Sequence, residues 1–145
     1  MNNFVGSWDG PPLRILLVDD NAINITFVKK LLTKLGHDVV LAENGSICLE
    51  DLEQNTFDVV LMDIQMPVMS GLDAIKEIRK REQGISFHQP VIALTAYSLR
   101  GEEERFLEEG FDGYLSKPLD LKELIAEFKR VMIIDGKLQR YLKKS

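Results

Sequence analysis

Carboxylates stand at the ends of two short apolar runs in this chain. Asp19 and Asp20 follow residues 13–18, and Asp63 follows residues 59–62. Short runs rich in β-branched side chains are typical of buried strands in a parallel sheet, and ligands bind at the carboxyl ends of such strands. In a doubly wound sheet the first and third strands are neighbours. We therefore expect the three carboxylates to share one crevice.

Two more polar groups follow strands farther along the chain: Thr95 comes after residues 91–94, and Lys117 comes soon after residues 114–115. Three carboxylates in one crevice repel one another as bare anions, and a hard cation such as Mg²⁺ relieves that repulsion through oxygen ligands. A lysine ammonium and a threonine hydroxyl both contact phosphoryl oxygens readily. Together these groups indicate phosphoryl transfer, with an aspartate able to act as the nucleophile and form an acyl phosphate.

The elements that must position these groups alternate along the chain. Expected strands cover residues 13–18, 39–42, 58–62, 91–94 and 114–115, and a helical pattern follows each of them. This alternation predicts an α/β fold with a doubly wound, five-stranded parallel sheet, covered on both faces and joined by right-handed crossovers. In the first helix, Asn21 is the expected cap. The apolar face of that helix is predicted from helical spacing to contain Ile23, Phe27, Leu31 and Leu35.

Length and composition limit both the number of domains and the class of function. The 145 residues are 45% hydrophobic and 28% charged, with a formal net charge of −5. These values fit one globular domain and argue against direct nucleic-acid binding as the main function. No apolar run is long enough to span a membrane. The single cysteine, Cys48, fits a cytoplasmic, reducing compartment and is interpreted as an inert helix residue.

The chain is expected to contain a flexible leader (residues 1–12), one domain (residues 13–133) and a C-terminal tail (residues 134–145). Gly and Pro are frequent in the leader, which is typical of a linker. Trp8 is therefore expected to be loose, although docking on the domain is the alternative. His37 and His88 are interpreted as solvated loop residues without a role as phosphodonors.

Four segments of the sequence resemble the receiver domains of two-component response regulators, and in particular the receivers of hybrid sensor kinases. They are LVDDN at 17–21, MDIQMPVMSG at 62–71, ALTA at 93–96 and GYLSKP at 113–118, in the expected order. The resemblance covers residues 13 to about 132 and implies a flavodoxin-like fold with strand order 2-1-3-4-5. Ser70 replaces an acidic residue that is common at its position, and we expect this change to affect the loop only locally.

The resemblance also implies a role for each site residue. Asp63 is expected to be the phosphoacceptor, Thr95 the switch hydroxyl that binds the phosphoryl group, and Lys117 its ion-pair partner. Tyr114 is expected to turn inward when Thr95 moves, the alternative being an ordinary core tyrosine. The expected Mg²⁺ ligands are Asp20, Asp63 and the backbone carbonyl of Gln65, with Asp19 acting through water.

Two further features follow from the same resemblance. The peptide bond between Lys117 and Pro118 is expected to be cis. Gln65 and Tyr97 flank the expected site, and we interpret them as residues that tune the loss of the phosphoryl group.

These roles imply a signalling switch and not a turnover enzyme. Asp63 would accept a phosphoryl group from a phosphohistidine of a histidine kinase or a histidine phosphotransfer protein. The surface around strands four and five would then change toward an unidentified downstream protein or a phosphorylation-dependent dimer, without direct contact with nucleic acid or membrane. Two alternatives stay open. One is a receiver-like binding module that works without phosphorylation. The other is a small-molecule phosphatase that works through an aspartyl phosphate. Gln65 argues against the phosphatase, because such enzymes generally have a second acidic residue, two positions after the nucleophile, as acid and base.

Overall fold

The sheet of this protein places the predicted site residues Asp19, Asp20, Asp63, Thr95 and Lys117 at or just beyond the carboxyl ends of parallel strands. The computed structural model describes residues 8, 10–96 and 102–135. Its strands are β1 (Arg14–Val18), β2 (Asp38–Ala42), β3 (Val59–Asp63), β4 (Val91–Thr95) and β5 (Gly113–Ser116). Its helices are α1 (Ala22–Lys34), α2 (Gly45–Gln54), α3 (Gly71–Arg81), α4 (Glu102–Glu109) and α5 (Leu121–Asp135). The strand order is β2-β1-β3-β4-β5, all parallel, which confirms the predicted fold class and topology.

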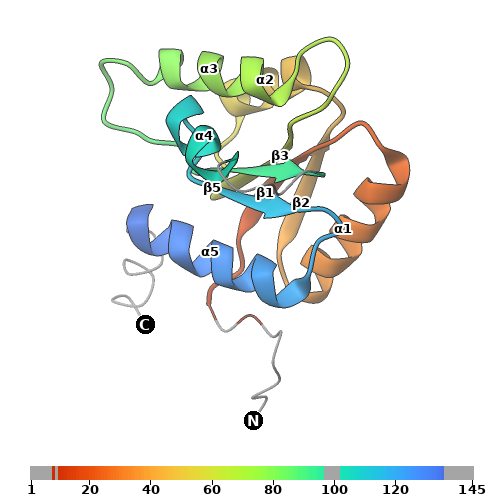
Figure 1. The fold of residues 1–145 in the computed structure, drawn as a ribbon. Coiled ribbons are helices and arrows are strands. Elements are labelled where there is room, and N and C mark those ends of the chain that lie inside the picture. Colours follow the sequence, from red (N-terminus) through yellow and green to blue (C-terminus); the bar gives the residue numbers. More distant parts are fainter. Residues whose placement is uncertain (1–7, 9, 97–101, 136–145) are drawn as a thin grey trace.

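Helices cover both faces of the sheet, with α1 and α5 on one face and α2 and α3 on the other (Figure 1). Every residue of β3 and of β4 is buried, as expected for central strands that are covered on both sides. Successive side chains of a strand point to opposite faces. One apolar cluster accordingly joins the strands to α1 and α5, and a second joins them to α2, α3 and Phe106 of α4.

Side-chain caps begin the first three helices. The Oδ1 atom of Asn21 accepts the backbone N–H groups of Ile23 and Asn24, which confirms the expected cap of α1. Asn44 and Ser70 cap α2 and α3 in the same way. The short side chain at position 70 therefore has a structural use, because it satisfies a backbone N–H that a helix start leaves open.

The predicted apolar face of α1 was wrong in its first turns. Ile23 is 81% exposed and Phe27 is 47% exposed, whereas Val28 and Leu32 are buried. Leu31 and Leu35, in the later turns of the predicted face, are partly buried and pack against the same core cluster as Val28 and Leu32. Ile23 and Phe27 form an exposed apolar stripe in the first turns, near the carboxyl ends of the strands.

Trp8 and His37 are packed residues, which contradicts their expected places in a loose leader and a solvated loop. His37 is only 5% exposed, and its Nδ1 atom accepts the N–H of Leu13 at 3.0 Å. Trp8 packs against the core cluster on the side of α1 and α5. His88 is about half exposed, as expected of a loop residue, but its ring lies 2.7 Å from a carboxylate oxygen of Asp112.

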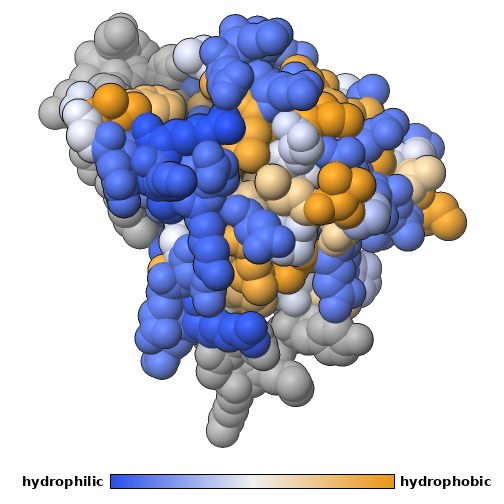
Figure 2. Space-filling view, turned by 90° about the horizontal axis from the view of Figure 1, so that it is seen from above, coloured by the Kyte–Doolittle hydropathy of each residue, from blue (hydrophilic) through white to orange (hydrophobic). Residues whose placement is uncertain are grey.

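Hydrophilic side chains cover much of the face that carries α2 and α3, with apolar side chains gathered between them (Figure 2). Beneath that surface, Cys48 is fully buried, and burial raises the pKa of its thiol to about 12. The thiol therefore stays protonated at neutral pH, which confirms its interpretation as inert. Among the residues that the structure describes, no helix is long and apolar enough to cross a membrane.

Candidate functional site

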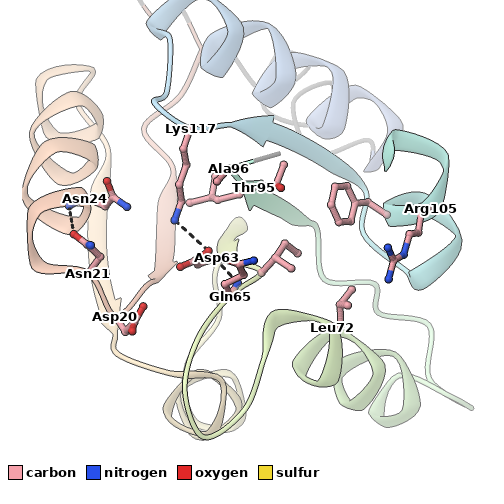
Figure 3. A pocket seen from close by; sticks show the side chains of 13 residues that line it. Asp20, Asn21, Asn24, Asp63, Gln65, Leu72, Thr95, Ala96, Arg105 and Lys117 are labelled. Carbon is pink, nitrogen blue, oxygen red and sulfur yellow. Dashed lines mark hydrogen bonds and ion pairs between the residues drawn. The ribbon is translucent and has the colours of Figure 1, made fainter. Parts of the chain in front are cut away.

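The carboxyl ends of β1, β3, β4 and β5 converge on one hollow of about 430 Å³. Asp63 and Thr95 are the last residues of β3 and β4, and Lys117 follows β5 directly. Asp63, Thr95 and Lys117 all line the hollow, together with Asp20 from the β1–α1 loop (Figure 3). The structure thus brings together side chains that lie almost 100 residues apart in the sequence.

Three carboxylates form the acidic part of the site. Asp19 and Asp63 are buried and Asp20 is exposed, yet one oxygen of each lies within 4.8 Å of the others. Asp19 Oδ1 accepts the N–H of Asn21 at 2.9 Å. Asp19 Oδ2 is buried without a hydrogen-bond partner among the described residues, and only the Lys117 ammonium, 3.5 Å away, approaches it. An unsatisfied buried carboxylate oxygen is costly, so this atom indicates a site prepared for a cation.

Lys117 is the cation that the chain itself supplies. Its Nζ atom lies 3.1 Å from Asp63 Oδ1, and the ion pair is drawn in Figure 3. One ammonium does not balance three carboxylates. The pKa of Asp63 is raised, chiefly by burial and also by the nearby charge of Asp19, while Lys117 acts to lower it. The site therefore holds net negative charge, part of it on buried carboxylates.

Close backbone contacts hold Asp63 in place. The N–H of Gln65 donates to Asp63 Oδ1 at 3.2 Å, and the N–H of Gly71 donates to the carbonyl of Ile64 at 3.0 Å. A Cβ atom at Gly71 would collide with the carbonyl oxygen of Asp63 and lie 2.9 Å from the Cα of Ile64. Between these contacts, Val68 has a φ of 69°, which is strained for a β-branched residue. The loop that supports Asp63 is thus fixed by glycine at one point and strained at another.

Lys117 is held from its other side by the backbone. Its N–H donates to the carbonyl of Thr95 at 2.8 Å, and its peptide bond to Pro118 is cis, as expected. Thr95 itself is buried. These contacts keep the ends of β4 and β5 side by side at the hollow.

The acidic cluster fits a hard divalent cation. Its donors are carboxylate oxygens, one of them buried without a hydrogen-bond partner, and Mg²⁺ is bound in proteins by one or two carboxylates plus water. Asp19, Asp20 and Asp63 are the residues that would hold the ion. The role of the Gln65 backbone carbonyl as a ligand stays a prediction.

Tyr114 lies away from the hollow, in β5. Its side chain is partly buried and packs against the second core cluster, with its ring 6.4 Å from that of Phe106. Its role as a switch therefore stays a prediction. Tyr97, expected to tune phosphoryl loss together with Gln65, lies outside the described residues.

Two polar residues that line the hollow were not identified from the sequence. Asn24 reaches it from the first turn of α1, and Arg105 reaches it from α4 (Figure 3). Asn24 lies three residues after the cap Asn21, on the same side of the helix, and that spacing is the only signal that could have identified it. Arg105 has no such signal, because α4 is distant in sequence from the other site residues.

Comparison with known proteins agrees with this geometry. Hybrid signal transduction histidine kinase I of Dictyostelium discoideum is 41% identical to this chain over 118 residues, which are 78% of this chain and 7% of that protein. This chain therefore spans only a small part of that much longer relative.

Two solved structures are similar in both sequence and fold. One is the receiver domain of sensor histidine kinase PA1611 from Pseudomonas aeruginosa PAO1, with a magnesium ion coordinated in its active site cleft. It has a TM-score of 0.73 at 38% identity, covering 84% of this chain and 98% of that one. The other is the receiver domain of Ssk1 from Saccharomyces cerevisiae, in complex with the histidine phosphotransfer protein Ypd1. It has a TM-score of 0.72 at 28% identity, covering 91% and 90% of the two chains.

The family assignment rests on a match that spans most of the domain. The response regulator receiver domain family matches residues 15–129, which include β1 from its second residue, all of β2 to β5 and most of α5. All the predicted site residues lie inside that range. Together with the parallel sheet in the order 2-1-3-4-5, this match shows that the chain belongs to the response regulator receiver domain family.

Proposed function

We propose that this chain is a phosphorylation-dependent switch in which Asp63 accepts a phosphoryl group from a phosphohistidine. The observation that carries the proposal is the pairing of the buried Asp63 with the Lys117 ammonium, 3.1 Å away, inside a cluster of three carboxylates. A purely structural polar cluster would be expected to satisfy its buried hydrogen-bonding atoms. This site keeps excess negative charge and an unsatisfied oxygen, which suits it to a cation and a phosphoryl group.

In the proposed reaction, a carboxylate oxygen of Asp63 attacks phosphorus. A P–O bond forms, the P–N bond to the donor imidazole breaks, and that bond's electron pair returns to the imidazole. Lys117 then pairs with a phosphoryl oxygen, and the N–H of Gln65 keeps the Asp63 side chain oriented. Mg²⁺ held by the acidic cluster would neutralise negative charge during transfer.

The change would travel through the strand ends. Thr95, at the end of β4, is proposed to bind the phosphoryl group with its hydroxyl. Tyr114, whose position in β5 is directly beside Ala93 of β4, would then repack against α4. The surface of β4, β5 and their helices is the proposed contact for a downstream protein, and the chain is proposed to act in the cytoplasm without turning over a substrate of its own.

The exposed stripe of α1 suggests where the phosphodonor docks. Ile23 and Phe27 lie on α1, whose first turn lines the site, and Val68, 87% exposed, lies on the loop that follows Asp63. Exposed apolar side chains around a polar site are typical of a protein interface. We infer that this rim binds a histidine phosphotransfer protein, a class of partner that the receiver of Ssk1 binds in its solved complex.

Transfer from a radiolabelled, phosphorylated histidine phosphotransfer protein tests both parts of the proposal. The wild-type chain should gain the label in the presence of Mg²⁺, and Asp63→Asn should gain none. Phe27→Ala should slow transfer from the protein donor at least tenfold but leave labelling by acetyl phosphate unchanged. Ile85→Ala, which removes an apolar side chain that is 59% exposed and distant from the site, is the matched control and should change neither rate.

Label that persists in Asp63→Asn would contradict the assignment of the acceptor. If no phosphodonor labels the wild type, the chain is a binding module that works without phosphorylation. Equal slowing by Phe27→Ala and Ile85→Ala would contradict the docking rim and leave the acceptor assignment intact.

A further inference from the structure

Trp8 is the only tryptophan of the chain, and it is packed against the domain from outside the regular elements. Its ring centroid lies 5.2 Å from that of His37 and 6.1 Å from that of Phe128 on α5, with edge-to-face geometry in both pairs. The rings of His37 and Phe128 are themselves 5.8 Å apart. Three aromatic rings thus contact one another pairwise, an arrangement that stabilises beyond the burial of area alone.

His37 contacts the entering chain at two points. Its Nδ1 atom accepts the N–H of Leu13, the residue before β1, while its ring meets the indole of Trp8. Because Nδ1 accepts a hydrogen bond, the neutral imidazole carries its proton on Nε2. Nε2 is buried without a hydrogen-bond partner among the described residues, so the ring is held by packing on that side.

The entering segment is also shaped for this contact. The indole Nε1–H of Trp8 donates to the carbonyl of Pro11 at 2.8 Å, which closes a turn. Pro11 and Pro12 restrict the backbone that leads to Leu13, which is buried. Little conformational entropy remains to be lost when the indole docks, because the turn and the prolines have already restricted the segment.

We propose that His37 and Phe128 form a docking site for the indole of Trp8, and that this clasp fixes the N-terminal part of the chain beside α5. The occupant is this chain's own residue, and the site is suited to an aromatic side chain that meets both rings edge to face. The clasp lies at the amino end of β1, beside Leu13, whereas the proposed phosphodonor rim lies near the carboxyl ends of the strands, so the two are separate. Its consequence is that Trp8 itself has a defined place beside α5.

Time-resolved fluorescence anisotropy of the single tryptophan tests the clasp in the full chain. In the wild type the anisotropy should decay with the tumbling time of the whole domain. Phe128→Leu keeps an apolar residue but removes one ring, and it should add a fast component. Phe111→Leu is the matched control, since Phe111 is also buried but belongs to the cluster on the opposite face of the sheet, and its decay should match the wild type.

A second measurement avoids any change in the core. Trp8→Ser should speed amide hydrogen exchange at Leu13 at least tenfold, because the packing that protects its bond to His37 is removed. A wild-type anisotropy dominated by the fast component would overturn the proposal. Leu13 exchange that is equal in Trp8→Ser and the wild type would also overturn it.

Discussion

Two polar clusters at opposite ends of the sheet differ in how completely their charges are satisfied. At the carboxyl end, three carboxylates lie together, two of them (Asp19 and Asp63) pair with the ammonium of Lys117, and Asp19 Oδ2 lacks a hydrogen-bond partner among the described residues. At the amino end, the guanidinium of Arg79 donates to Glu82, Asp112 and the carbonyls of Gln89 and Gly110, all at 2.8 Å. Both clusters join elements that are far apart in sequence.

The contrast distinguishes a polar cluster that holds the fold together from one that is suited to bind a ligand. In the Arg79 cluster, Asp112 also accepts the N–H of Val91 and Glu82 accepts the N–H of Gln89, so its carboxylates are used to hold β4, β5 and α3 together. In the Asp63 cluster, three carboxylates face one ammonium, and Asp19 Oδ2 has no hydrogen-bond partner among the described residues. A fully satisfied network specifies a fold, whereas an unsatisfied one at the carboxyl end of a sheet is suited to a ligand.

The largest effect is expected from breaking the satisfied cluster. Arg79→Ala leaves two mostly buried carboxylates and two carbonyls without their donor, and it should lower the free energy of unfolding by ~3 kcal/mol in urea denaturation. The control is Arg81→Ala on the same helix, which removes exposed ion pairs to Glu53 and Glu77 and should cost less than ~1 kcal/mol. Equal losses in the two variants would show that the Arg79 cluster is not structural.

A smaller loss, with a functional consequence, is expected at Gly71. A methyl group there collides with the carbonyl of Asp63, so Gly71→Ala should cost ~2 kcal/mol and slow labelling of Asp63. Gly84→Ala is the control: its φ of 83° makes alanine unfavourable by ~1 kcal/mol, but no atom lies near the added methyl group. Labelling as fast in Gly71→Ala as in Gly84→Ala would contradict the role of Gly71 in positioning Asp63.

Removing a charge from the Asp63 cluster should stabilise the fold, in contrast to the two losses above. Asp63→Asn removes a buried carboxylate whose pKa is raised chiefly by burial, and it should raise the free energy of unfolding by ~1 kcal/mol without Mg²⁺. Added Mg²⁺ should stabilise the wild type more than the variant, because binding to the folded state alone stabilises it. A lower free energy of unfolding in Asp63→Asn would contradict this prediction, because it would show that the attraction between Asp63 and Lys117 outweighs the repulsion among the carboxylates.

The smallest effect concerns His37, which is buried and partly unsatisfied but carries no charge. Burial lowers its pKa from 6.5 to about 4, with Asp58 raising it slightly in return. The unfolded chain therefore binds more protons than the folded one between those values, so stability is complete above pH 6.5 and falls as the pH drops toward 4. Urea denaturation should show a loss of ~1 kcal/mol between pH 7.5 and 5.5 that His37→Gln lacks. Identical pH profiles of stability in the wild type and His37→Gln would contradict this role of His37.

The sequence was sufficient to predict the fold class and the grouping of the site residues. The apolar runs that end in Asp19 and Asp63 are buried strands, because a central parallel strand must be apolar on both faces. Once the strands are parallel, their carboxyl ends meet at one edge of the sheet. The positions of Asp20, Asp63 and Lys117 follow from that geometry.

The errors arose where a local pattern has two solutions. α1 carries two apolar stripes, and spacing alone does not show whether Phe27 or Val28 faces the sheet. His37 follows a helix-ending glycine and reads as a loop residue, but Leu13 and Phe128, distant in sequence, bury it. The Arg79 cluster gave no signal, because its partners Gly110 and Asp112 lie more than thirty residues away.

The central claim is that Asp63 is the phosphoacceptor of the unsatisfied cluster. The most direct test is the intact mass of the wild type and of Asp63→Asn after incubation with acetyl phosphate, with and without Mg²⁺. The account predicts the mass gain of one phosphoryl group in the wild type only when Mg²⁺ is present, and none in Asp63→Asn. A gain in Asp63→Asn, or no gain in the wild type under any condition, would contradict it.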